Sequence, residues 1–296
     1  MQPLCSRRPE RFEREWHKAH AWGQDPNHPV SLRGGCIAAI TSAELDRKID
    51  LTRKTHSLWS ARRLSVLSPG DPAIPERPGR PAKPDLVHPR LVKKRSLTSQ
   101  RGRIALMHAI AHIELNAIDL ALDIVARFAG HRVPRSFFDG WMRVAFEEAK
   151  HFSLLRARLR GLGADYGDLP AHDGLWQAAH DTRNDLHARL AVVPLILEAR
   201  GLDVTPSLIA RLEETGDHAT ADILKIIYTD EKGHVAIGAK WFRFFCARDR
   251  LDPAMRFRAL VQANFHGRLK PPFNEPARAA AGLTPLFYRA LSSASS

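Results

Sequence analysis

The sequence predicts an all-α protein built around a four-helix bundle. The bundle is expected to consist of two antiparallel hairpins joined by a long crossover, with an N-terminal helical and proline-rich extension and short C-terminal helices. From Arg101 onward, long segments separated by glycine and proline repeat apolar residues at helical spacing, and no convincing strand alternation is present. Two of the three connections are short, whereas the third is long enough to cross the length of a bundle.

Four long helices are expected in this region. The first three are expected to stop at Gly130, Gly163 and Gly201, and the fourth is expected to begin after Gly216 and Asp217. The segment 163–176 is rich in turn formers and is expected to form the crossover. The expected ranges are about 102–129, 136–162, 173 or 182 to 200, and 218–248.

The segments on either side of the bundle differ from it in composition. A helix is expected to start at Ala43, capped by Thr41 or Ser42, and another short one is expected near residues 277–281. Residues 67–89 hold seven of the 20 prolines, so they form an extended connector that is either free or wrapped over the body. We therefore divide the chain into an N-terminal arm (1–100), the bundle (101–250) and a C-terminal extension (251–296).

Composition limits the classes of protein that a chain of 296 residues can represent. With 44% hydrophobic and 26% charged residues it is globular, and no window approaches the roughly 18 apolar residues of a membrane-spanning helix. Cys5, Cys36 and Cys246 are odd in number and far apart, so they suggest neither a disulfide framework nor a thiolate metal site. This cysteine usage favours a reducing cytoplasm.

Positive charge is concentrated near the N-terminus. Residues 1–103 contain 21 Lys and Arg against 10 Asp and Glu, which accounts for most of the net charge of +13. A basic region of this kind suggests contact with phosphate or another polyanion. A solvated basic surface is an equal alternative.

Each long helix has a glutamate at a position where its apolar stripe would otherwise continue: Glu114, Glu148, Glu198 and Glu231. A carboxylate in an apolar interior costs several kcal/mol unless it is paired or bound to a metal ion. Four such acids meeting without cations would repel one another. The pattern therefore favours a metal site over a coincidental set of core acids.

Two of these helices also carry the motif Glu-x-x-His, which places a carboxylate and an imidazole on one helix face. The two motifs are Glu148 with His151 and Glu231 with His234. Glu148 follows Glu114 by 34 residues, and Glu231 follows Glu198 by 33, so the same helical hairpin occurs twice. This repeat matches the arrangement of carboxylate-bridged di-iron and di-manganese bundles.

The six residues can hold two divalent metal ions through four carboxylates and two imidazoles: Glu114, Glu148, His151, Glu198, Glu231 and His234. Oxygen and nitrogen ligands without thiolate favour iron or manganese over structural zinc. We expect a pair of iron ions, with Mn/Fe and Mn/Mn pairs as alternatives, and open coordination positions would let dioxygen or peroxide bind.

Two further residues are candidates for a direct role in chemistry. Asp230 could accept the second N–H of a ligating histidine, or it could be an exposed helix acid. Tyr228 could donate a hydrogen bond or an electron to the site, or it could be a half-buried core tyrosine. Glu147 and Lys150 are expected to face water. Pro194 is expected to kink the third helix, and a substrate entrance is predicted at His172, Asp173 and His180.

Six segments of this sequence carry a resemblance to known proteins: HAIAHIELNAIDLALD (108–123), VAFEEAKHF (144–152), YGDLPAHDGLW (166–176), RLAVVPLILEARGLDVTP (189–206), DEKGHVAIGAKWF (230–242) and PPFNEPARAAAGL (271–283). Together they resemble the ferritin-like superfamily. Within it, the chain is similar to the bacterial family catalogued as domain of unknown function 455, and the similarity extends over about residues 78–283. That resemblance implies a di-metal bundle whose ligands fall on the six residues named above. A bacterial tRNA-hydroxylating enzyme belongs to the same superfamily.

Three functions are compatible with this pattern. The first is an oxygen-activating oxidase or hydroxylase that acts on a small molecule or a tRNA-like substrate and takes electrons from a donor. The second is iron or peroxide handling, or storage, without an organic substrate. The third is an RNA-binding or tRNA-modifying protein that uses the basic N-terminal region. No membrane association is expected, and a homodimer is considered.

Overall fold

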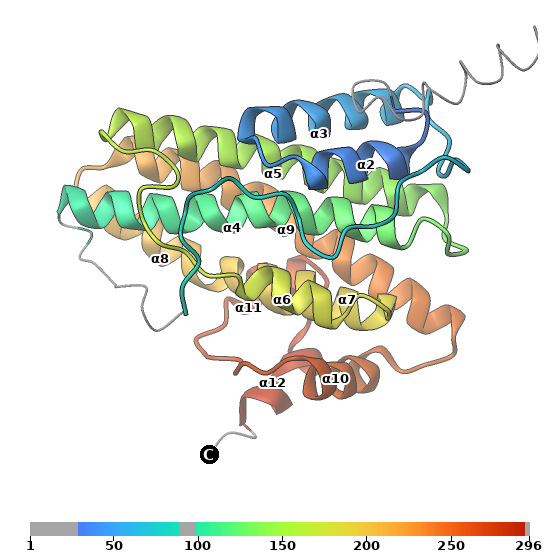
Figure 1. The fold of residues 1–296 in the computed structure, drawn as a ribbon. Coiled ribbons are helices and arrows are strands. Elements are labelled where there is room, and N and C mark those ends of the chain that lie inside the picture. The colour runs from blue at the N-terminus through green and yellow to red at the C-terminus, as the bar shows by residue number, and fades with distance from the viewer. Residues whose placement is uncertain (1–28, 89–96, 98, 294–296) are drawn as a thin grey trace, which may run out of the picture.

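A computed structural model describes residues 29–88, 97 and 99–293 (Figure 1). These residues form helices and no β-strand, which confirms the all-α prediction. Residues 1–28, which include Cys5, and residues 89–96 and 98, which include Pro89, lie outside the described residues, so the structure describes only part of the basic N-terminal third. The elements in chain order are α2 (Leu32–Thr41), α3 (Leu45–Ser60), α4 (Gln100–Arg127), α5 (Arg135–Gly161), α6 (Gly174–Asp181), α7 (Leu186–Val192), η2 (Val193–Glu198), α8 (Ala199–Glu214), α9 (His218–Arg248), α10 (Pro253–Asn264), α11 (Glu275–Ala280) and α12 (Pro285–Ser293).

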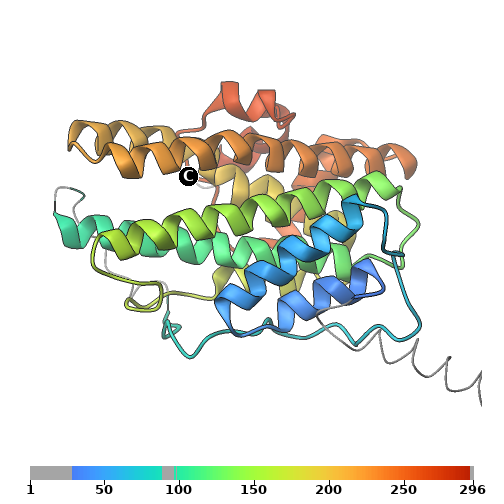
Figure 2. The ribbon, with the colours of Figure 1, turned by 90° about the horizontal axis from the view of Figure 1, so that it is seen from above.

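Two helical hairpins form the centre of the molecule. Short turns join α4 to α5 and α8 to α9, the helices of each hairpin pack along each other, and α5 lies against α9. The long connection between the hairpins, residues 162–185, carries α6 (Figure 1, Figure 2). Side-chain caps set two of the helix starts, because Ser99 accepts a hydrogen bond from Gly102 N and Asp217 accepts one from Thr220 N. The bundle therefore has the predicted pair of hairpins and crossover.

The third helix of the bundle differs from the prediction at both ends. It starts with α7, after α6 has formed a separate short helix, and it continues through η2 to the end of α8 instead of stopping at Gly201. Gly201 and Pro206 both lie inside α8. A glycine in a helix interior costs only about 1 kcal/mol, whereas α8 buries Leu202 and Leu212 completely. Packing therefore outweighs the local stop signal.

The middle of this helix is a π-helix, η2, which begins one residue before Pro194. Proline has no backbone N–H, so the regular α-helical hydrogen bonding is interrupted there. On α9, Gly238 faces this proline so closely that a Cβ atom at Gly238 would lie 2.5 Å from Pro194 Cβ. The glycine thus permits the close approach of the two helices and brings Glu198, at the end of η2, toward α9.

The N-terminal helices α2 and α3 pack against α4 and α5 (Figure 2). α3 begins at Leu45 and is capped by Glu44, not by Thr41 or Ser42, because the Glu44 carboxylate accepts hydrogen bonds from two backbone N–H groups of the first turn. Lys48 on α3 is only 1% exposed. Its Nζ atom donates to Ala39 O (3.1 Å), Ile40 O (2.9 Å) and Asp119 Oδ1 on α4 (2.5 Å). This ammonium group therefore joins the end of α2, α3 and the bundle.

The described part of the proline-rich connector is wrapped over the body rather than free (Figure 1). Val87 N donates to Ala171 O at 2.8 Å, and Ala171 N donates to Asp85 O at 3.0 Å, so the connector pairs with the crossover. Arg80 donates to Asn116 Oδ1 on α4 at 2.5 Å. These contacts hold the crossover against α4.

The C-terminal helices cover the opposite side of the molecule from α2 and α3 (Figure 1). α10 packs against α7, α9 and α12, and Phe257, Phe287 and Tyr288 are buried there. The short helix expected near residues 277–281 is α11. Side chains from all three predicted segments share one hydrophobic core. None of the described helices is long and apolar enough to cross a membrane.

Replacing Lys48 by methionine tests the anchoring of the N-terminal helices. Removing Lys48 leaves the buried Asp119 carboxylate with Arg80 Nη1, at 3.8 Å, as its basic partner among the described residues. Because this distance compensates the buried charge poorly, we expect Lys48→Met to lower the free energy of unfolding by about 3 kcal/mol. Urea denaturation followed by circular dichroism measures this change. Lys54→Met is the matched control, because Lys54 is exposed on the same helix. Equal stability of the two variants would contradict the proposed anchoring role.

Candidate metal centre

Four helices bring the predicted ligands into the interior of the bundle. Glu114 lies in the middle of α4, Glu148 and His151 on α5, Glu198 at the end of η2, and Glu231 and His234 on α9. Glu148 and both histidines have no exposed surface, and Glu114 is 4% exposed. The Glu231 side chain is 12% exposed. These acids and imidazoles therefore occupy a largely dry site.

Glu148 lies between the two imidazole rings. Its Oε1 atom is 2.9 Å from His234 Nδ1, and its Oε2 atom is 3.3 Å from His151 Nδ1. His151 Nδ1 is also 3.1 Å from Glu114 Oε2, and His234 Nδ1 is 3.5 Å from Glu231 Oε1. Both histidines thus direct the same nitrogen toward a common group of carboxylates.

The donor set fits metal ions. Glu114, Glu148, His151 and Glu231 each offer one ligand atom, and these atoms all lie within 4.8 Å of one another, so the four residues could hold a metal ion. Four donor atoms are buried and make no hydrogen bond of regular geometry among the described residues: Glu148 Oε1, Glu198 Oε2, Glu231 Oε2 and His234 Nδ1. Glu148 Oε1 and His234 Nδ1 lie 2.9 Å apart, but their orientation does not make a hydrogen bond. Buried polar atoms are normally satisfied, and a metal ion could supply the partner that these donor atoms need.

Glu198 is the least closely connected of the six predicted ligands. It is outside the group of four residues, Glu114, Glu148, His151 and Glu231, that could hold one ion. Its carboxyl group is nevertheless buried and close enough to Glu231 for the two charges to interact. Burial, and to a smaller extent the negative charge of Glu231, raise the pKa of Glu198 well above its usual value. It therefore faces the same site from η2.

The charges of the remaining groups respond to one another. Burial and the charge of Glu148 raise the pKa of Glu114 well above its usual value. Burial also opposes ionisation of Glu148, but the two imidazoles outweigh it and hold the pKa of Glu148 well below its usual value. The carboxylates in turn overcome the burial of His151 and raise its pKa to about 11. The carboxylates of the site therefore stabilise a positive charge placed among them, here that of the protonated imidazoles.

The outer nitrogens of the histidines make a reciprocal pair of contacts. His151 Nε2, from α5, lies 2.9 Å from Asp230 Oδ2 on α9, and His234 Nε2, from α9, lies 2.9 Å from Glu147 Oε2 on α5. In each case the acid directly precedes the glutamate of the opposite Glu-x-x-His motif. Such contacts fix the ring orientation of metal-binding histidines and strengthen their binding.

This arrangement gives Glu147 a role that the sequence analysis missed. The expectation that it faces water is wrong, since its side chain is only 14% exposed and is held by His234 and Arg143. Lys150 is 40% exposed but also donates to Asp230, at 2.5 Å. The signal available in the sequence was the doubled acid that precedes each motif, at 147–148 and 230–231.

The hydroxyl of Tyr228 is hydrogen-bonded to a residue outside the cluster of candidate ligands. Its hydroxyl accepts a hydrogen bond from Asn274 Nδ2 at 3.0 Å, and the ammonium of Lys232 lies 4.1 Å from the ring centroid. The structure therefore places Tyr228 as a contact between α9 and the C-terminal extension.

The three residues predicted at a substrate entrance make different contacts in the structure. His172 lines a cavity beside α4, whereas Asp173 pairs with Arg77 and His180 with Glu76. His112 on α4 anchors this region, because its Nε2 atom donates to His172 O (3.0 Å) while Nδ1 contacts the Tyr166 hydroxyl (2.8 Å).

Comparisons with known proteins bear on the same part of the chain. A family model described as "Protein of unknown function (DUF455)" matches residues 41–289. An uncharacterized protein of Haemophilus influenzae is 44% identical to the chain over 209 residues, which cover 69% of this chain and 73% of that protein. No solved structure matches.

The contacts of Asp230 with His151 and of Glu147 with His234 predict that loss of either acid weakens metal binding to a similar extent. Asp230→Asn and Glu147→Gln each remove the charge that orients one histidine, so each is expected to weaken metal binding by about 10- to 100-fold. Competition with a chelator, using Co(II) under anaerobic conditions, measures the affinity. Glu214→Gln, an exposed acid at the end of α8, is the control. Unchanged affinity in both variants would exclude the assigned orienting role.

Proposed function

The chain belongs to the DUF455 family, and we propose that it is a dinuclear iron protein that activates dioxygen to oxidise or hydroxylate an organic substrate. The observation that carries this proposal is the buried site in which Glu148 lies between two imidazoles while carboxylates approach from three other helix segments. The family assignment names no activity, so the proposal depends on the chemistry of the residues themselves.

The number and type of donors support two divalent ions. Four carboxylates, each formally carrying one negative charge, balance two divalent cations, and two imidazoles complete the ligand set. The residues that would hold the ions are Glu114, Glu148, His151, Glu198, Glu231 and His234. The described cysteines, Cys36 and Cys246, are free and are not among these donors. Nitrogen and oxygen donors favour iron, with manganese as the alternative.

When bound, two iron(II) ions would supply the electrons that reduce dioxygen. The residues of the chain provide the surroundings. Apolar side chains of the bundle keep bulk water out, while Asp230 and Glu147 orient the two imidazoles. Lys150 places a cationic donor on the outer side of Asp230, where it offsets the negative charge of that acid.

A cavity beside the site favours an organic substrate over iron storage. It is lined by residues of α4, η2 and α8, the elements that carry Glu114 and Glu198. The volume of about 460 Å³ is within the range of small-molecule sites. A storage protein requires no such cavity for a small organic molecule.

Loss of Glu148 is expected to remove the metal ions. Glu148→Ala deletes the carboxylate shared by both histidines, so metal content should fall from two ions per chain to fewer than 0.2, about a tenfold loss. Metal analysis of the purified full chain measures the content, and circular dichroism should show unchanged helicity. Glu214→Ala should keep two ions per chain. Retention of both ions by Glu148→Ala would refute the proposed site.

Oxygen consumption tests the activity. The protein is loaded anaerobically with two Fe(II) per chain and then mixed with oxygenated buffer. We expect oxygen uptake at least about tenfold faster than for the same Fe(II) in buffer, because the ligands hold both ions in place. His234→Ala should lose this acceleration. Absence of uptake by the loaded wild type would contradict oxygen activation, and uptake of hundreds of irons per particle would instead establish storage.

A further inference from the structure

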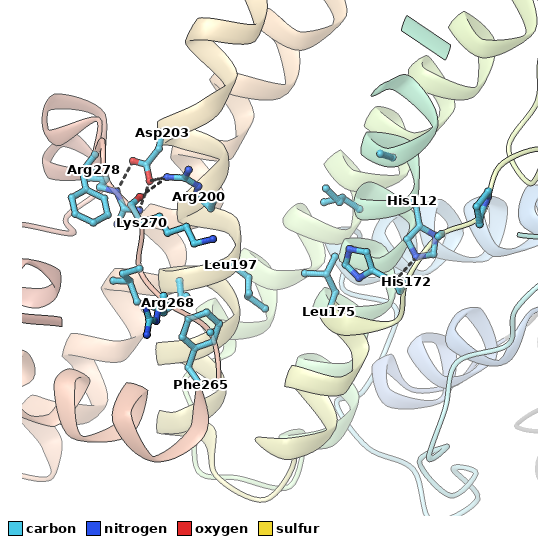
Figure 3. A pocket seen from close by; sticks show the side chains of 18 residues that line it. His112, His172, Leu175, Leu197, Arg200, Asp203, Phe265, Arg268, Lys270 and Arg278 are labelled. Carbon is cyan, nitrogen blue, oxygen red and sulfur yellow. Dashed lines mark hydrogen bonds and ion pairs between the residues drawn. The ribbon is translucent and has the colours of Figure 1, made fainter. Parts of the chain in front are cut away.

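The cavity beside the metal centre separates two helices of the bundle. Ala109, His112 and Ile113 of α4 line one side, and Leu197 and Arg200 of the η2–α8 helix line the other. The crossover residues 170–172 and the segment 265–273 complete its wall. Figure 3 shows Leu175, His172 and His112 across the cavity from the residues of α8 and the C-terminal segment.

The part of the cavity nearest the centre is apolar. Ile113 and Leu197 directly precede Glu114 and Glu198, so two residues of the wall are chain neighbours of two candidate ligands. Ile113 is 47% exposed although it lies in the middle of a bundle helix. An isoleucine held open to this cavity provides surface for an apolar ligand.

The far part of the cavity is cationic. Four of its lining residues are basic and only Asp203 is acidic. Asp203 is already bound by Arg278, whose Nε and Nη2 atoms each donate to its carboxylate at 2.7 Å. Arg200 Nη1 also lies 3.4 Å from Asp203 Oδ2. Because one acid faces four basic residues, this end keeps an excess of three positive charges. The four basic residues are Arg200, Arg268, Lys270 and Arg278.

Arg278 gives this end an unfilled hydrogen-bond donor. The residue is 2% exposed, and its Nη1 atom is buried without a hydrogen-bond partner in the described part of the chain. The guanidinium lies 4.9 Å from the Phe273 ring centroid and 4.7 Å from that of Tyr288, so aromatic rings hold it in place. A buried guanidinium with a free N–H is suited to an anionic oxygen.

The apolar end carries no comparable charge. Both ring nitrogens of His112 are engaged, one by His172 O and the other by the Tyr166 hydroxyl. No lysine, arginine, aspartate or glutamate is among the residues that line this end. The cavity therefore has one apolar end and one cationic end.

We infer that this cavity binds an organic anion with an apolar body, whose carboxylate or phosphate group meets Arg278, Arg200 and Lys270 while the body lies along Ile113 and Leu197. Its role as the substrate of the metal centre rests on the function proposed above. Binding itself does not require the metal ions, so the two can be tested separately.

Isothermal titration of the metal-free full chain with octanoate, octyl phosphate and 1-octanol tests the inference. We expect one octanoate or octyl phosphate per chain, and the tighter of the two identifies the head group. The uncharged octanol should bind roughly tenfold more weakly, because it forms no charge-assisted hydrogen bond. Failure of both anions to bind, or equal affinity for octanol, would overturn the inference.

Two sets of variants locate the bound probe. Arg200→Gln with Lys270→Gln should weaken anion binding by about tenfold, whereas Arg211→Gln with Lys54→Gln removes the same charge elsewhere and should leave it unchanged. Ile113→Trp should block the apolar end, whereas Ile226→Trp, at an isoleucine that is 42% exposed on α9, should not. Equal effects of test and control variants would place the probe outside the cavity and overturn the inference.

Metal analysis of the same samples separates the two proposals. Two ions per chain without anion binding would overturn the cavity assignment and leave the proposed metal centre intact. Anion binding in a chain that takes up no metal would support the cavity assignment and refute the proposed function.

Discussion

The central constraint on this structure is the presence of four carboxylates in the interior of an apolar bundle. A buried negative charge is unfavourable unless a cation lies close to it, and four together repel one another. The helices must therefore bring Glu148 between the imidazoles of His151 and His234, and the outer nitrogens of these rings must be held from the far side. The close approach at Gly238, which brings η2 toward α9, follows the same requirement.

Two other buried acids of α4 are neutralised by basic side chains. Asp119 and Asp123 lie on α4 five and nine residues after Glu114, and both are buried. Asp119 is paired with Lys48, and Asp123 is paired with Arg189. Among the described residues, by contrast, none of the four glutamates of the site forms an ion pair with a lysine or arginine. Two of these three buried acids of α4 thus have basic partners from α3 and α7, whereas Glu114 has none among the described residues, which supports a metal cation as the partner of Glu114.

The sequence predicts the bundle and its cluster of acids because buried glutamates interrupt the apolar stripes at regular positions. Glutamates at the centre of apolar stripes, and the repeat of one hairpin whose two glutamates are 34 or 33 residues apart, are visible without coordinates. The end of the third helix is not visible in this way, because burial of Leu202 and Leu212 overrides a glycine whose local cost is small. The position of Glu147 is also missed, since its partner His234 lies on another helix and only the packing of α5 against α9 brings them together.

The cavity and the candidate metal centre are both lined by the η2–α8 helix. On the η2–α8 helix, Glu198 faces the acids of the bundle, Leu197 lines the apolar part of the cavity, and Arg200 lines its cationic part. A ligand held by its anionic group at Arg200 and Arg278 would extend its apolar body toward the residues that precede Glu114 and Glu198. The anionic group is thereby kept with the basic side chains and away from the negative centre, where it would add to the repulsion. The same electrostatic requirement that assembles the acids therefore also determines which end of an organic anion can approach them.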